Sequence, residues 1–227
     1  MRRLKLRIFL ILLACSISAC GLLSSEPYVF KGLEFEDPVK APEFTLTNQN
    51  RQLVSLSDFR GKVVLLFFGF TNCPDACPST LGTWKQLHES LGDEVDKVSF
   101  IMITVDPERD TPEILKKHLA LFNSDFIGLH GTLEEIQEVA DDYNIYFEKE
   151  ESGSAAGYLV GHSTLSYLID TDGNLILGHR SYEASAGDIL SDIEYMLSKP
   201  SSAINSGGKL MLLCESGCMV NLPVRNQ

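Results

Sequence analysis

Basic residues are scarce in this 227-residue sequence, where 19 Lys and Arg face 31 Asp and Glu and the formal net charge is −12. Nucleic acid has the same sign of charge and would be repelled, so it is excluded as a partner. The composition also lacks the signs of a repeat or disordered protein. Hydrophobic residues make up 44% of the chain, enough for one substantial core, so we expect a single domain with appendages.

The apolar run at residues 8–13 is too short for a membrane-spanning helix, which needs ~20 apolar residues. Basic residues precede this run and small residues follow it up to Cys20, which is the layout of a secretory signal. Residues 17–20 (Ile-Ser-Ala-Cys) also resemble a bacterial lipobox, in which the signal is cut before a cysteine that then carries lipid.

We therefore expect a lipoprotein signal at residues 1–19, a lipid on Cys20 and a membrane-anchored, extracytoplasmic protein on the periplasmic side. An ordinary cleaved signal is one alternative, and a lipobox that ends at Cys15 is another. In each case the mature protein lies outside the cytoplasm, where disulfides can persist.

The rest of the chain divides into a tether at residues 20–40, a domain at 41–199 and a flexible tail with Cys and Met residues at 200–227. In the domain, the apolar runs 63–70 and 98–105 predict strands buried on both faces. Helices are predicted after Cys73 and at 111–122, 132–143 and 184–197, short strands at 44–46, 53–56, 126–129 and 145–147, and a hairpin at 163–177. This order predicts an α/β, thioredoxin-like fold with a mixed central sheet flanked by helices.

Two cysteines lie where the first buried strand should pass into a helix. Cys73 and Cys77 are about one helical turn apart, so both sulfurs can face the same side. The start of a helix favours thiolate over thiol. Such a pair can form a redox-active disulfide or bind a soft metal, and thiolates select Cu(I), zinc or iron–sulfur clusters. Two cysteines alone leave these roles open.

A metal site would need a third ligand from elsewhere in the chain. Helix packing, or a place at a strand end, accounts for four of the five histidines: His88, His118, His130 and His179. His162 precedes the predicted hairpin at 163–177, and in thioredoxin folds the loop entering that strand lies against the cysteine pair. His162 is therefore the candidate, although on local sequence alone it would be an ordinary loop histidine.

Three separated motifs resemble the Sco/SenC family of copper-binding proteins. They are residues 68–78 (Phe-Gly-Phe-Thr-Asn-Cys-Pro-Asp-Ala-Cys-Pro), residues 105–112 (Val-Asp-Pro-Glu-Arg-Asp-Thr-Pro), and Gly161-His162-Ser163 followed by Tyr167-Leu168. The resemblance spans residues 40–198 and implies that Cys73, Cys77 and His162 bind Cu(I) or Cu(II). It also implies a metallochaperone for the CuA centre of cytochrome c oxidase, with oxidase subunit II or another extracytoplasmic copper protein as partner.

Two positions depart from the family pattern, which usually has His where Asn72 stands and Asp where Gly161 stands. Loss of a carboxylate beside the ligand histidine is expected to weaken Cu(II) binding or to change the mobility of the histidine. Residues 106–111 are interpreted as a strand end followed by a helix cap at the rim of the site, without a direct metal role.

The tail carries a second cysteine pair, Cys214 and Cys218, beside Met211 and Met219. A local disulfide is the preferred interpretation for an exported protein. A second Cu(I) site is the alternative, because thioether and thiolate are both soft ligands.

The domain also fits a second class of protein, an extracytoplasmic thiol-disulfide oxidoreductase that reduces partner cysteines by cycling Cys73 and Cys77. A peroxiredoxin fits less well. Its reactive cysteine follows a Thr or Ser three positions earlier, and Phe70 stands there in this chain.

Overall fold

An eight-stranded sheet forms the centre of the computed structural model, which describes residues 28–154, 157–180 and 183–199. Its strands are β1 (Leu33–Lys40), β2 (Thr45–Asn48), β3 (Leu53–Ser55), β4 (Val63–Gly69), β5 (Val98–Thr104), β6 (Ile127–His130), β9 (Leu165–Ile169) and β10 (Asn174–Arg180). They lie in the order β1-β10-β9-β4-β5-β6-β2-β3. β4, β5 and β6 are parallel, whereas β9 and β10 pair antiparallel, so the predicted mixed sheet is confirmed.

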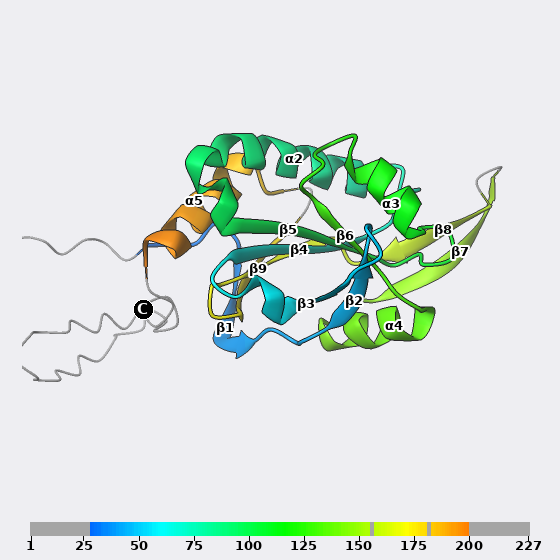
Figure 1. Ribbon diagram of the computed structural model, residues 1–227, viewed down its shortest axis with the longest axis horizontal. Helices are drawn as coiled ribbons and strands as arrows, with labels where there is room; N and C mark the ends of the chain where they lie inside the picture. Colours follow the sequence, from blue (N-terminus) through cyan, green and yellow to red (C-terminus); the bar gives the residue numbers. More distant parts are fainter. Residues whose placement is uncertain (1–27, 155–156, 181–182, 200–227) are drawn as a thin grey trace, which may run out of the picture.

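Helices cover both faces of this sheet. They are α2 (Ala76–Leu91), α3 (Pro112–Leu119), α4 (Leu133–Asp142) and α5 (Ala186–Ser198), with short 3-10 helices η2 (Leu56–Phe59) and η3 (Gly92–Lys97). Figure 1 shows α2 and α3 above the sheet and α4 below it. Among the described helices, α3, α4 and α5 begin at side-chain caps from Thr111, Thr132 and Ser185, as their sequences favour.

The core surrounds the central strands and includes residues of α2, α4 and α5. Every residue of β4 and β5 is buried, as their continuous apolar runs predict. Trp84 of α2 packs edge-on against Phe67 of β4 and Phe126, with ring centroids 6.1 and 5.7 Å apart. This packing holds the start of α2 at the carboxyl end of β4, where the two cysteines lie.

The prediction of a tether at residues 20–40 is partly wrong, because residues 28–40 belong to the folded domain. β1 pairs antiparallel with β10 at the edge of the sheet. The residues before β1 bind the buried carboxylate of Asp192 on α5, which accepts hydrogen bonds from Tyr28 Oη at 2.7 Å and from the backbone N–H of Gly32 at 3.0 Å. These contacts join residues distant in the chain, so local composition could not reveal them.

A separate two-stranded sheet projects from the domain, formed by β7 (Phe147–Ser154) and β8 (Gly157–His162) (Figure 1). The sequence predicted only a short extended piece at 145–147 and placed His162 in a loop. Strand β8 instead ends at His162, whose backbone lies opposite Phe147. The charged run 148–151 conceals the strand pattern of β7. The apolar residues 158–160 could have indicated β8.

Several sequence predictions concern residues outside the described ranges. They are the signal at 1–19, the lipid on Cys20, and the Cys214–Cys218 pair in the tail. Within the described ranges, none of the helices combines the length and the hydropathy needed to cross a membrane.

Candidate functional site

The two cysteines of the predicted site lie together at the start of α2. Cys73 is half-buried in the loop after β4, and Cys77 is fully buried in the first turn of the helix. Both are thiols in the structure. The backbone N–H of Cys77 points at Cys73 Sγ, at 3.4 Å. An amide at a helix start, aimed at sulfur, favours negative charge on that sulfur.

The two thiols have different environments. A hydrogen bond with the Cys73 side chain and burial raise the pKa of Cys77 well above its ordinary value, against a lowering contribution from the backbone of Phe70. Cys77 therefore keeps its proton while no metal is bound. Cys73, which solvent reaches, is the thiol that an incoming ion or partner meets first.

We expect iodoacetamide to alkylate Cys73 before Cys77 in the reduced, metal-free protein. Each unit of raised pKa lowers the thiolate fraction tenfold, so the rate at Cys77 should be at least ~10-fold lower. Peptide mass spectrometry over a time course measures both rates, and equal rates would contradict this assignment. The chain used is the two-cysteine chain, in which serine replaces Cys15, Cys20, Cys214 and Cys218.

Gly69, the last residue of β4, makes room for the buried sulfur. A Cβ atom at this position would lie 3.0 Å from Cys77 Sγ and 2.5 Å from the ring of Phe67. Both distances are shorter than ordinary contacts between such atoms. The absence of a side chain at residue 69 therefore lets α2 approach the strand closely enough to place Cys77 over its end.

The buried carboxylate of Asp110 holds the loop that carries Cys73 in place. Asp110 accepts hydrogen bonds from the backbone N–H and the hydroxyl of Thr71, and from Thr104 Oγ1 at 2.7 Å. Burial raises the pKa of Asp110, although these hydrogen bonds act in the opposite direction. The sequence assigned Asp110 to a helix cap together with Thr111. Thr111 alone caps α3, and Asp110 holds the loop that carries Cys73.

A second buried carboxylate, Asp106, faces the projecting hairpin. It accepts a hydrogen bond from Tyr158 Oη of β8 at 2.7 Å and forms an ion pair with Arg109. Burial and the hydrogen bond to Asp106 raise the pKa of Tyr158 to about 12. The site therefore has a polar rim that the sequence located at residues 106–111 but whose contacts it could not specify.

The candidate histidine lies at the end of β8. The next residue, Ser163, donates its backbone N–H to the carbonyl oxygen of Tyr146, at 3.2 Å. The side chain of His162 lies outside the described part of the structure, so its role as a ligand stays a prediction. Among the described residues, no group of three or more His, Cys, Asp or Glu is arranged to hold a metal.

The other histidines have separate environments. His179 is buried with its Nε2 3.0 Å from Asp192, and His88 lies 3.5 Å from Asp125. The ring of His118 on α3 is tilted against that of Phe122, and burial lowers the pKa of His118 against the opposing influence of Asp110 and Cys73. His118 therefore lies within electrostatic reach of Cys73.

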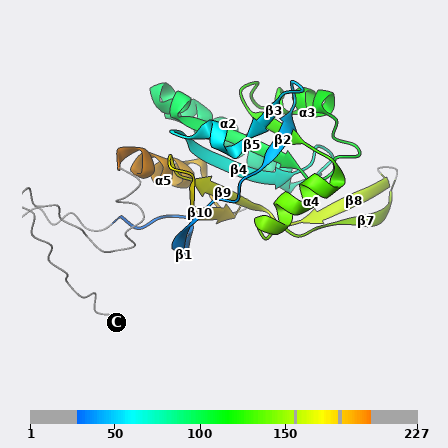
Figure 2. The same cartoon turned by 60° about the horizontal axis from the view of Figure 1, so that its bottom comes forward.

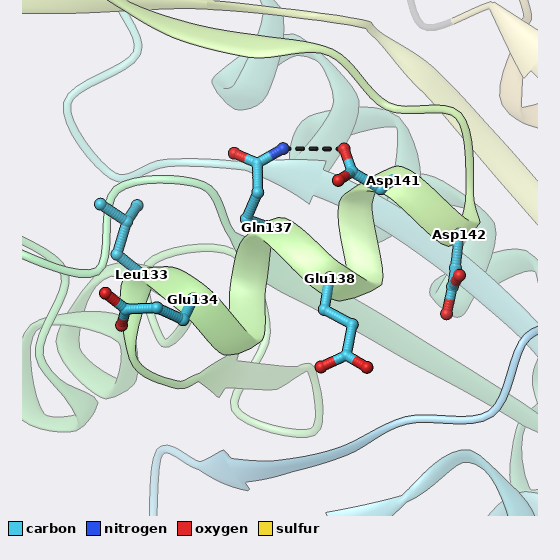
Figure 3. Close-up of a pocket in the computed structure, with 6 residues that line it drawn as sticks. All are labelled: Leu133, Glu134, Gln137, Glu138, Asp141 and Asp142. Atoms are coloured by element: carbon cyan, nitrogen blue, oxygen red, sulfur yellow. Dashed lines mark hydrogen bonds between the residues drawn. The ribbon is translucent and has the colours of Figure 1, made fainter.

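A hollow on the outer side of α4 is unrelated to this site. It has a volume of about 650 Å³ and is lined by Leu133, Glu134, Gln137, Glu138, Asp141 and Asp142. Figure 3 shows that these side chains all come from the one helix, with Gln137 bonded to Asp141. Neither cysteine lines the hollow, so the chemistry of the thiols, rather than the size of the cavity, locates the candidate site.

Comparison with known proteins shows the same fold in proteins of one family. Residues 34–198 match the SCO1/SenC family. The SCO2-like protein of Rickettsia prowazekii is 35% identical over 158 residues, which cover 69% of this chain and 77% of that protein.

Two solved structures extend the comparison. Bradyrhizobium japonicum ScoI with copper bound is 35% identical with a TM-score of 0.64, and the match covers 69% of this chain and 98% of that chain. BsSco, described as a member of the Sco family of cytochrome c oxidase assembly proteins, is 29% identical with a TM-score of 0.60 and coverages of 76% and 99%. Matches over nearly all of each solved chain confirm the predicted thioredoxin-like fold.

Proposed function

The chain belongs to the SCO1/SenC family, and from that membership we propose that it is a copper-binding metallochaperone that assists assembly of cytochrome c oxidase. The observation that carries the proposal is the pair of thiols at the start of α2, with a backbone amide 3.4 Å from Cys73 Sγ. Thiolates are preferred ligands of Cu(I). A matching solved structure with copper bound favours copper over the other soft metals.

We propose Cys73, Cys77 and His162 as the copper ligands. The two sulfurs suit Cu(I), and an imidazole adds affinity for Cu(II). Copper is the cargo of the protein, and the thiolates give it a low-coordinate site from which another protein's thiolates can displace it. The recipient would be the CuA centre of oxidase subunit II or another extracytoplasmic copper protein, reached by a domain anchored through lipid on Cys20.

The residues of the chain then have distinct tasks. Cys73 makes the first contact because solvent reaches it, whereas Cys77 must lose its proton before it can bind. Copper binding therefore competes with protons and strengthens as the pH rises. Asp110 keeps the loop of Cys73 in place through Thr71. The more accessible Cys73 is also the ligand that a partner's thiolate would displace first.

Reduction of partner cysteines is the second candidate function, and the closeness of two thiols at the start of α2 supports it. A reductase would turn over disulfide substrates without metal. A metallochaperone would instead bind about one copper ion per chain through two sulfurs and one imidazole. Both measurements on the same reduced protein separate these functions.

Replacing His162 by alanine tests the proposed ligand set in the two-cysteine chain. Loss of an outer partner of a ligand already lowers metal affinity by about 10–100-fold, so we expect loss of the ligand itself to lower Cu(II) affinity by at least ~100-fold. Cu(I) affinity should change less, because two thiolates still hold that ion. Competition titrations with chelators of known affinity measure both constants.

His118→Ala is the matched control, because His118 lies on α3 within electrostatic reach of Cys73. It should leave Cu(II) affinity unchanged. Equal loss of Cu(I) and Cu(II) in His162→Ala, or a larger loss of Cu(II) in His118→Ala, would overturn the assignment of His162.

A further inference from the structure

The hairpin that carries His162 needs a docking contact, because it is not part of the main sheet. β7 and β8 pair with each other and form a sheet of their own. Figure 2 shows the hairpin extending away from the edge of the domain. Backbone ladder bonds to the eight-stranded sheet therefore do not set its position, and side-chain contacts with the domain become important.

Tyr158 of β8 makes several of these contacts. Its hydroxyl donates to Asp106 Oδ1 at 2.7 Å, and its carbonyl oxygen accepts from Arg109 Nη1 at 3.0 Å. The guanidinium carbon of Arg109 lies 3.7 Å from the centroid of the Tyr158 ring. On the neighbouring strand, Lys149 Nζ lies 2.6 Å from Glu108 and 4.9 Å from the Tyr158 ring. Both strands are thus held by one turn, residues 106–109.

The residue that follows this turn, Asp110, holds the cysteine loop. Asp110 bonds Thr71, two residues before Cys73, and the backbone N–H of Asp110 donates to the carbonyl oxygen of Asp106 at 2.9 Å. Asp106 and Asp110 are both fully buried, and removal of either would leave buried donors without an acceptor. One short segment therefore connects the thiols with the hairpin that ends at His162.

We propose that Tyr158 is a positioning residue for the copper site: by docking on Asp106 and Arg109 it fixes the hairpin, and with it His162, relative to Cys73 and Cys77. This inference rests on the proposed function. Tyr158 is four residues from His162, or ~13 Å along a strand, so we assign it a positioning role and not that of a ligand. Its docking should affect the affinity for Cu(II), which uses the imidazole. The affinity for Cu(I) should depend on it much less, because two thiolates retain that ion.

Tyr158→Phe in the two-cysteine chain tests the proposal, because it removes the hydroxyl and keeps the ring beneath Arg109. We expect Cu(II) affinity to fall about 10-fold, as for loss of an outer partner of a metal ligand. Cu(I) affinity should stay within about 2-fold, because the thiolates are untouched. In the metal-free protein, amide hydrogen exchange at residues 147–162 should become faster, since the hairpin is less firmly docked.

Tyr146→Phe is the matched control, because Tyr146 is exposed and its hydroxyl bonds Glu148 on the hairpin itself. It should change neither copper affinity nor hydrogen exchange beyond the nearest residues. Unchanged Cu(II) affinity in Tyr158→Phe, or an equal fall for Cu(I) and Cu(II), would overturn the positioning role. If the unsubstituted chain binds no copper at all, the proposed function fails, and faster exchange in Tyr158→Phe would still show the docking contact.

Discussion

Replacing Cys73 by serine is expected to abolish copper binding at the site, from about one equivalent per two-cysteine chain to none. A serine hydroxyl is a hard, protonated group that cannot replace a thiolate toward Cu(I). The second sulfur, Cys77, is buried and has a raised pKa, so by itself it captures the ion poorly. The intense thiolate-to-copper charge-transfer absorption of the Cu(II) form should disappear together with the bound metal.

Two measurements check this result, metal analysis after gel filtration and the visible spectrum of the Cu(II)-loaded protein. Ser79→Ala, an exposed substitution in the first turn of α2, is the control and should keep both signals. If Cys73→Ser still bound a full equivalent of copper with an unchanged spectrum, the thiol pair would not be the copper site. Repeating the titration with Cys214 and Cys218 restored shows whether the tail binds copper of its own.

Replacing Asp192 by alanine is expected to destabilise the domain by about 3 kcal/mol or more, which is roughly 6–12 °C in Tm. The fully buried carboxylate accepts hydrogen bonds from Tyr28 and from the backbone N–H groups of Lys31 and Gly32, and it lies 3.0 Å from His179 Nε2. Removing it leaves several donors unpaired and releases the segment before β1. Thermal unfolding followed by circular dichroism measures the change.

The loss of stability caused by Asp192→Ala should depend on pH in a defined direction. Burial alone would raise the pKa of Asp192, but its hydrogen bonds with His179, Tyr28 and two backbone N–H groups outweigh burial and lower the pKa. The carboxylate therefore stabilises the fold above about pH 4, and this stabilisation is lost as the pH falls through the lower pKa of the folded state. The Tm difference between the wild type and Asp192→Ala should be largest near neutral pH and shrink in acid.

Glu194→Ala provides the control on the same helix, because Glu194 is exposed and should change stability by less than about 0.5 kcal/mol. A Tm difference for Asp192→Ala that matches the Glu194→Ala value, or that grows as the pH falls below 4, would contradict the role assigned to the buried carboxylate.

The central sheet and its helices were predictable because their signals are local. Continuous apolar runs predicted β4 and β5, helical spacing predicted α2, and capping residues such as Thr111 and Thr132 marked where helices begin. The β7–β8 hairpin was missed because the charged run 148–151 hides the strand pattern. The strand β1 was missed because its partner, β10, lies about 140 residues away.

By itself, the sequence determined the fold class, the position of the cysteine pair at a strand-to-helix junction, and the choice of His162 as the candidate third ligand. Only the tertiary structure decided what surrounds them. Asp110 reaches Thr71 across 39 residues, and Tyr158 reaches Asp106 across 52. Periodicity and caps depend on neighbours within a turn or two, whereas these contacts exist only once the chain has folded and brought remote residues together.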